Sequence, residues 1–275
     1  MVFAGGNLAQ CVRAYLCRNT IGAGLLPGQR LNHYPASLTC AITWMIHGST
    51  ELVVDADLAN TSEAPSRIVF SGPSSRPFTT YNPSEVHFFV LLLLPDAVQM
   101  LTGMDVPAWV DRHGPVADVM DAAWTAMADQ VLHAQSDAQR VQLIEAFLAP
   151  QWAQLKQPAA HPGQLMADWL RVITARALTS GAGQSLRQAE RRVKLWAGQT
   201  MRQLRRIGRA ETSFLIARRA HRNGSMKWSD FAAERGFSDQ SHLGREVRKL
   251  SGLSPEELMR AIDTDEAFWL YRIWN

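Results

Sequence analysis

The segment from Trp228 to Met259 places helix-stopping and helix-starting residues at short, regular intervals. Gly236 stands where a short helix must end, because glycine readily adopts the left-handed conformation of a helix terminus. Gly252 stops the next helix in the same way. Residues 254–257 read Ser-Pro-Glu-Glu, which is typical of a helix start with a capping box and a proline in the first turn. The segment therefore predicts three short helices joined by tight turns.

The middle helix of this segment has one apolar stripe and one polar face. Ser238 or Asp239 can cap its N-terminus. The apolar positions, spaced by four and three residues, are Leu243, Val247 and Leu250. The polar side chains off this stripe are Gln240, Ser241, His242, Arg245 and Arg248. Such a helix suits the DNA major groove, where Gln can pair with adenine and Arg with guanine, although an ordinary helical hairpin with a polar outer face has the same pattern.

The same residues resemble a known family. Residues 236–243 read Gly-Phe-Ser-Asp-Gln-Ser-His-Leu, Arg245 follows, and residues 252–255 read Gly-Leu-Ser-Pro, which is similar to the signature of AraC/XylS-type regulators. Leu243 stands where that family commonly has an aromatic residue, a change that keeps the position apolar. The resemblance implies sequence-specific binding of double-stranded DNA and transcription regulation in bacteria, by activation or repression. RNA polymerase is then an expected partner if the protein is an activator.

Such regulators carry a second, upstream helix-turn-helix unit. Residues 185–193 fit its recognition helix, with Ser185 and Gln188 forming a capping box, and residues 198–202 resemble the stretch that ends it. Thr and Met replace Ser and Pro in that stretch, and the supporting helix over 167–178 is followed by a loose turn over 180–183. The upstream base-contact candidates are Arg187, Gln188 and Arg191.

A long helix over residues 200–222 is expected to connect the two units. It would hold both recognition helices so that they enter successive major-groove segments, about one turn of DNA apart. Its expected buried side consists of Met201, Leu204, Ile207, Leu215 and Ile216. Its arginines, expected to face solvent or phosphate, are Arg205, Arg206, Arg209, Arg218 and Arg219.

The charge distribution supports a basic C-terminal part. Residues 1–160 carry 8 Lys and Arg against 13 Asp and Glu, whereas residues 161–275 carry 20 against 12. An excess of that size fits neutralisation of phosphates, and equally fits a solvated basic face. A Pro- and Gly-rich stretch over 157–163 coincides with the change. We therefore expect two domains, residues 1–157 and 158–275, with helix-turn-helix units at about 165–200 and 225–262.

The N-terminal part is predicted to be an α+β domain with a small antiparallel sheet or partial, cupin-like barrel and flanking helices. Its strand candidates are 38–46, 51–54, 67–70, 78–81 and 86–94. Helical spacing begins after Pro95. The stretch around 67–77, the strand pair and Leu94-Pro95 resemble, more weakly, the N-terminal domain of some AraC-type proteins. Such domains commonly sense a small molecule or mediate dimerisation, so an effector and a homodimer are expected partners.

Histidines and cysteines give no sign of a metal site or a cofactor. His33, His47 and His87 could meet inside a barrel, but no His-x-His pair or spaced carboxylate accompanies them. Three cysteines without paired spacing indicate free thiols in a reducing cytoplasm. The aromatic residues of the sheet would line either a core or an apolar pocket; they are Trp44, Phe70, Phe78, Tyr81, Phe88 and Phe89.

Enzymatic and membrane functions find little support. The chain has no G-x-S-x-G, phosphate-binding glycine loop or H-E-x-x-H, so we expect no catalytic residues. No secretory signal is apparent, and the apolar run 88–94 is shorter than the roughly 20 residues that span a bilayer. The alternatives left open are an interaction module with degenerate DNA binding and an enzyme in the N-terminal barrel.

Overall fold

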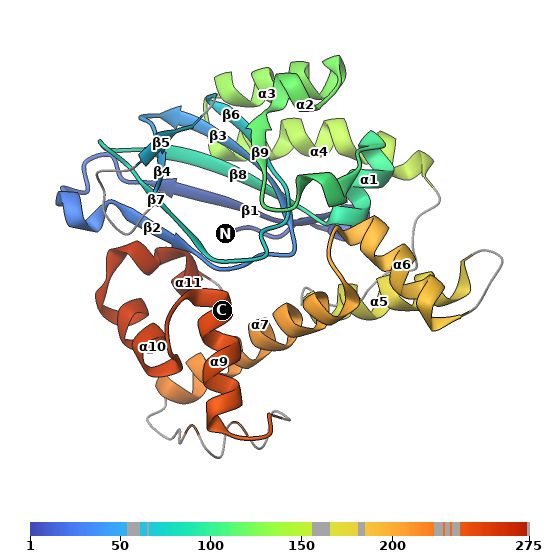
Figure 1. Ribbon diagram of the computed structural model, residues 1–275. Coiled ribbons are helices and arrows are strands. Elements are labelled where there is room, and N and C mark those ends of the chain that lie inside the picture. Colours follow the sequence, from blue (N-terminus) through green and yellow to red (C-terminus); the bar gives the residue numbers. More distant parts are fainter. Residues whose placement is uncertain are drawn as a thin grey trace.

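The computed structural model describes residues 1–53, 61–64, 66–155, 166–180, 185–222, 228, 232 and 237–273. Two antiparallel sheets precede a part built from helices, which confirms the predicted α+β class (Figure 1). Among the described residues no strand follows residue 115. The linker expected at 157–163 lies outside the described residues.

A five-stranded sheet forms the centre of the N-terminal part. Its strands, in spatial order, are β1 (Val12–Asn19), β8 (His87–Leu93), β3 (Cys40–His47), β6 (Ile68–Ser71) and β9 (His113–Pro115). All neighbours in this sheet are antiparallel. Strand β8, the second in this order, is an almost unbroken apolar run, and six of its seven residues are buried.

A smaller sheet lies beside the C-terminal helices. Its strands, in spatial order, are β2 (Leu31–Tyr34), β7 (Phe78–Tyr81), β4 (Glu51–Val53) and β5 (Thr61–Glu63). Across the residues that the structure describes, neither sheet closes on itself. The expected partial, cupin-like barrel is therefore present as two open sheets.

The sequence pattern missed the strands that begin the sheets. We expected the sheet to begin near Ser37, but β1 and β2 precede it. In β1 the side chains of Arg13, Cys17 and Arg18 interrupt the apolar pattern, and β2 is only four residues long. These strands form because distant partners, β8 and β7, supply their hydrogen bonds.

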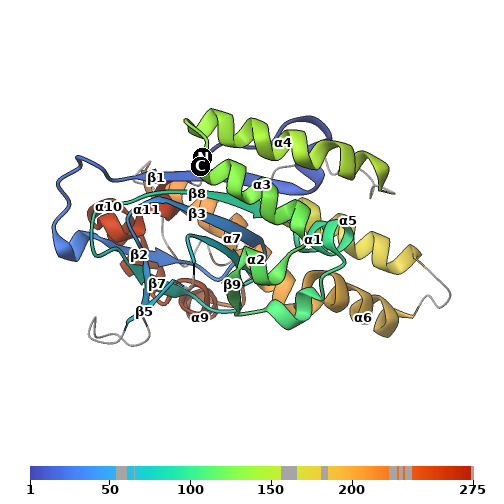
Figure 2. The ribbon, with the colours of Figure 1, turned by 90° about the horizontal axis from the view of Figure 1, so that it is seen from above.

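Helices cover one face of the five-stranded sheet (Figures 1 and 2). They are α2 (Val116–Val119), α3 (Ala122–His133) and α4 (Asp137–Gln154), whereas α1 (Pro95–Thr102) and η3 (Val106–Trp109) lie at one end of the sheet, next to α6 (Leu186–Ala197). The indole of Trp44 in β3 donates a 2.8 Å hydrogen bond to the carbonyl of Ala128 in α3. Trp44 is fully buried, so this bond satisfies a polar group that the packing removes from water.

The remaining helical elements lie at the two ends of the chain. They are η1 (Gly6–Gln10), η2 (Pro27–Gln29), α5 (Met166–Thr179), α6 (Leu186–Ala197), α7 (Met201–Arg222), α9 (Gln240–Ser251), α10 (Pro255–Thr264), η4 (Glu266–Phe268) and α11 (Trp269–Ile273). The expected connecting helix is confirmed as α7. None of the described helices combines the length and apolar character that crossing a membrane requires.

One apolar core runs from the sheet into the first C-terminal helices. It includes Val98 of α1, Trp169 of α5 and Val193 of α6. Asp96, at the start of α1 and only 5% exposed, accepts a 2.8 Å hydrogen bond from the Trp169 indole and pairs with Arg176 at 3.0 Å. The helix pair α5–α6 is therefore anchored on the sheet-bearing part.

Gly72, directly after β6, provides a test of this packing. A Cβ atom there would lie 2.0 Å from the carbonyl oxygen of Trp109, so Gly72→Ala must push the two segments apart. We expect the free energy of unfolding to fall by about 1–3 kcal/mol, measured by urea unfolding. Gly28→Ala, where nothing lies within 4 Å, is the matched control and should leave stability nearly unchanged. Equal losses in both variants would contradict this account.

Candidate functional site

Helix α6 has a capped N-terminus, one buried stripe and one exposed polar face. The hydroxyl of Ser185 caps it by accepting a 3.3 Å hydrogen bond from the Gln188 backbone N–H. Its buried residues, spaced by four, are Ala189, Val193 and Ala197. The predicted upstream candidates Arg187, Gln188 and Arg191 are all exposed.

Gly198 ends α6, as the sequence predicted, with φ at +74°. A Cβ atom at this position would lie 2.9 Å from a methyl group of Val110, so only glycine allows this close approach. The guanidinium of Arg176 lies 4.2 Å from the ring centroid of Trp196, near the same end of α6. The C-terminal end of α6 is thus held firmly, while its N-terminal half faces solvent.

Helix α9 is capped by Asp239, which decides between the two predicted capping residues. Its carboxylate accepts a 2.6 Å hydrogen bond from the backbone N–H of His242. This bond, together with those from Ser238 and the nearby cations, keeps the pKa of Asp239 below its usual value. The predicted stripe is buried at Leu243 and Leu250, whereas Val247 is half-buried.

The downstream candidates Gln240, Ser241, Arg245 and Arg248 are exposed on α9. His242 differs because it has local partners. Its Nδ1 lies 3.2 Å from the hydroxyl of Ser238, and its ring meets Phe237 edge-on with centroids 5.5 Å apart. These contacts of His242 stabilise the turn before α9.

The helix that should precede α9 is described only at Trp228 and Ala232, and Gly236 lies outside the described residues. Ala232 is fully buried, and it packs with Phe237, Leu243 and Ala217 of α7. After α9, the capping box of Ser254 and Glu257 is present as predicted at the start of α10. The downstream unit thus has its own small core on the end of α7.

Helix α6 has a third exposed cation beside Arg187 and Arg191. Arg187, Arg191 and Lys194 recur at spacings of four and three on the exposed side of α6. The sequence analysis missed Lys194, although the same helical spacing could have found it. Arg248 already forms an ion pair on the surface, because its guanidinium lies 3.4 Å from the Glu257 carboxylate.

Arg218 of α7 corrects an expectation. We expected it to face solvent or phosphate, but it is 7% exposed and donates to the backbone carbonyls of Tyr271 at 2.5 Å and Arg272 at 2.8 Å. These carbonyls lie in the last turn of α11, and a cation at the C-terminal end of a helix interacts favourably with the helix dipole. Arg218 therefore holds α11 in place.

Helices α6 and α9 lie toward opposite ends of α7 and are not parallel. Figure 2 shows α9 nearly end-on, whereas α6 runs across the same view.

An apolar cavity of about 350 Å³ lies between the sheets and the C-terminal helices. The sheets contribute Leu16, Val90 and Leu92, and the helices contribute Ile207, Phe214 and Leu250. Among the aromatic residues that could line a core or a pocket, Phe78 and Phe88 line this cavity, while Trp44, Phe70 and Phe89 belong to the core.

Polar contacts close the rim of this junction. Arg13 pairs with Glu211 of α7 at 2.9 Å, and Arg18 pairs with Glu266 at 3.0 Å. The guanidinium of Arg18 also lies 4.7 Å from the ring centroid of Trp269. Because Arg13 and Arg18 come from β1, the strand that sequence analysis missed binds both α7 and the C-terminal end of the chain.

The three histidines considered for a metal site do not form one group, because His33 lies in the smaller sheet. His33 contacts Thr79 at 2.8 Å and packs on Phe268, and burial lowers its pKa. His47 is exposed and lies opposite His87 across the β3–β8 pair. His87 faces a cysteine and an aspartate instead.

No family model matches this chain, and no curated protein matches it. Solved structures of ToxT from Vibrio cholerae are similar to this chain. An apo ToxT variant is 11% identical, with 90% of this chain and 96% of that chain covered and a TM-score of 0.42. A second ToxT structure is 12% identical, with 90% and 98% covered and a TM-score of 0.40. ToxT with a bound unsaturated fatty acid is 12% identical, with 89% and 94% covered and a TM-score of 0.36. At these values the likeness carries no argument about residues or ligands.

The junction between β2 and α11 can be tested by a double-mutant cycle. The Trp269 indole donates a 2.9 Å hydrogen bond to the side-chain oxygen of Asn32, which is fully buried. Trp269→Phe leaves that oxygen unsatisfied and should lower the free energy of unfolding by about 1–3 kcal/mol. In urea unfolding, Trp269→Phe combined with Asn32→Leu should cost less than the sum of the single changes. Strict additivity would show that the bond contributes nothing.

Proposed function

We propose that this chain is a sequence-specific DNA-binding transcription regulator that reads DNA with α6 and α9. The observation that carries the proposal is that two separately capped helices expose Arg and Gln, the side chains that pair with guanine and adenine in the major groove. On α6 these are Arg187, Gln188 and Arg191, and on α9 they are Gln240 and Arg245, with Ser241 between them. The resemblance of residues 236–255 to AraC/XylS-type regulators supports the same function.

The length of α7 suits this role. It has 22 residues, which corresponds to about 33 Å at 1.5 Å per residue. That length is close to one turn of B-DNA, the spacing between successive major-groove segments on one face of the duplex. A single chain could thereby contact two segments of one site once α6 and α9 are aligned.

We further propose that the cavity binds a mostly apolar small molecule. Its size lies at the lower end of the range for ligand pockets, and most of its lining surface is apolar. Its walls come from both sheets and from α7 and α9, so an occupant would contact the supports of the reading helices. A ligand that favours one arrangement of these walls would shift the alignment of α6 and α9.

The domain division at 157/158 belongs to this proposal, with residues 1–157 as the sensor part and residues 158–275 as the DNA-binding part. An interaction module that has lost DNA binding is the competing hypothesis. It predicts no shift of any DNA fragment at low salt.

Two arginines test the proposed DNA reading. After selection of bound fragments from a genomic pool, Arg191→Ala and Arg245→Ala should each cost about 1–3 kcal/mol of discrimination between the selected and a scrambled site. Arg76→Ala, which removes an exposed arginine of the N-terminal part, is the control and should bind like the unaltered protein. Competition binding at a fixed salt concentration measures the difference. An equal loss on both DNAs would make either residue a phosphate contact.

The cavity is tested by filling it. Ala41 of β3 lines the cavity, so Ala41→Phe should abolish the saturable binding of an apolar fluorescent dye without unfolding the protein. Ala126→Phe places the same side chain on the exposed face of α3 and serves as the control. Dye titration with circular dichroism separates the outcomes. Unchanged binding by Ala41→Phe would place the dye elsewhere and remove this support.

A further inference from the structure

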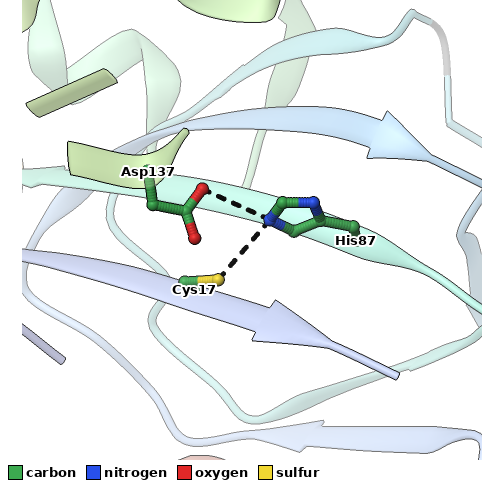
Figure 3. A group of neighbouring side chains, drawn as sticks. All are labelled: Cys17, His87 and Asp137. Carbon is green, nitrogen blue, oxygen red and sulfur yellow. Dashed lines mark hydrogen bonds and ion pairs between the residues drawn. The ribbon is translucent and has the colours of Figure 1, made fainter. Parts of the chain in front are cut away.

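Three side chains with metal-binding chemistry meet on the helix-covered side of the five-stranded sheet (Figure 3). They are Cys17 of β1, His87 of β8 and Asp137, the first residue of α4. In the β1–β8 register Cys17 lies opposite Phe89 and Asn19 lies opposite His87, so Cys17 and His87 are diagonal neighbours on one face. Residues far apart in the sequence are thereby brought together by strand pairing and by the docking of α4.

The distances match the edges of a tetrahedral coordination sphere. The Cys17 Sγ lies 3.6 Å from His87 Nε2, and that nitrogen lies 3.3 Å from Asp137 Oδ1. With a zinc–sulfur distance of about 2.3 Å and zinc–nitrogen and zinc–oxygen distances of about 2.1 Å, tetrahedral edges are about 3.6 Å and about 3.4 Å. All three ligand atoms lie within 4.8 Å of one another.

A buried arginine holds the carboxylate through the same oxygen that faces His87. The guanidinium of Arg140, a residue only 3% exposed, lies 2.7 Å from Asp137 Oδ1 and donates to the carbonyl of Ala134 at 2.6 Å. Outer partners of this kind fix ligating carboxylates in metal sites. The Cys17 side chain is only partly buried, so an ion can enter from solvent.

The same geometry disfavours nucleophilic catalysis by Cys17. A catalytic His uses one ring nitrogen for the nucleophile and the other for the carboxylate, but here His87 Nε2 faces both partners. Burial, together with the neighbouring Asp137, also raises the pKa of the Cys17 thiol to about 12. Without an ion the thiol is neutral.

We propose that Cys17, His87 and Asp137 form a site for one zinc-like divalent transition-metal ion. Sulfur and imidazole ligands favour such an ion over Mg²⁺ or Ca²⁺. The ion forms bonds to Sγ, Nε2 and a carboxylate oxygen, the thiol proton leaves to solvent, and water fills the fourth position. The site departs from the sequence expectation of no metal, which rested on the spacing of histidines, cysteines and carboxylates along the chain. A bound ion would link the start of α4 to β1 and β8.

Co²⁺ is the probe for this site, because its spectrum reports both thiolate ligation and tetrahedral geometry. Chelator-treated full-length protein should bind one equivalent of Co²⁺, with a thiolate-to-cobalt charge-transfer band and strong visible bands, and excess Zn²⁺ should remove both. Cys17→Ser should abolish the charge-transfer band, since Cys11 and Cys40 are buried. His87→Gln should weaken binding at least about 10-fold, as loss of a ligand or its support does.

The matched control is His133→Gln, which removes an exposed histidine of α3 and should bind Co²⁺ normally. Thermal unfolding with and without Zn²⁺ supplies a second readout, because an ion that binds only the folded protein raises the melting temperature. The rise should disappear in Cys17→Ser. A charge-transfer band that survives Cys17→Ser, or the absence of saturable Co²⁺ binding by the folded protein, would overturn the proposal.

Discussion

The placement of the helix pair α5–α6 depends on one buried carboxylate. Asp96 is removed from water at the start of α1, and a charge in that position is tolerated only with partners. Both partners, Trp169 and Arg176, come from α5. Arg176 also contacts Trp196 near the end of α6. The Asp96–Arg176 ion pair is therefore linked to α6 as well as to α5. The upstream unit is therefore part of one packed body with the sheet.

The downstream unit is attached differently. It packs in its own small core on α7, and its neighbour α11 is held through Arg218, Arg18 and Asn32 around an apolar cavity. The two reading helices thus have different supports, and the cavity borders only one of them closely. A small molecule there could change the position of α9 more easily than that of α6. This asymmetry gives the proposed regulation a physical basis.

Local patterns were read correctly from the sequence, and long-range partners were not. The caps at Ser185 and Ser254, the stops at Gly198 and Gly252 and the helix α7 follow from interactions within a few residues. Strand β1 was missed because its hydrogen bonds come from β8, more than 60 residues away in the numbering, and because its arginines find partners only in the folded chain.

The sequence by itself determined the α+β class, the helical C-terminal part and the exposed faces of α6 and α9, because helical periodicity and capping are encoded over short distances. Only the tertiary structure decided that Arg218 is buried, that His242 braces a turn, that an apolar cavity separates the sheets from α7 and α9, and that Cys17, His87 and Asp137 meet. Each of these depends on strand register or helix docking, which bring together residues that no spacing rule along the chain connects.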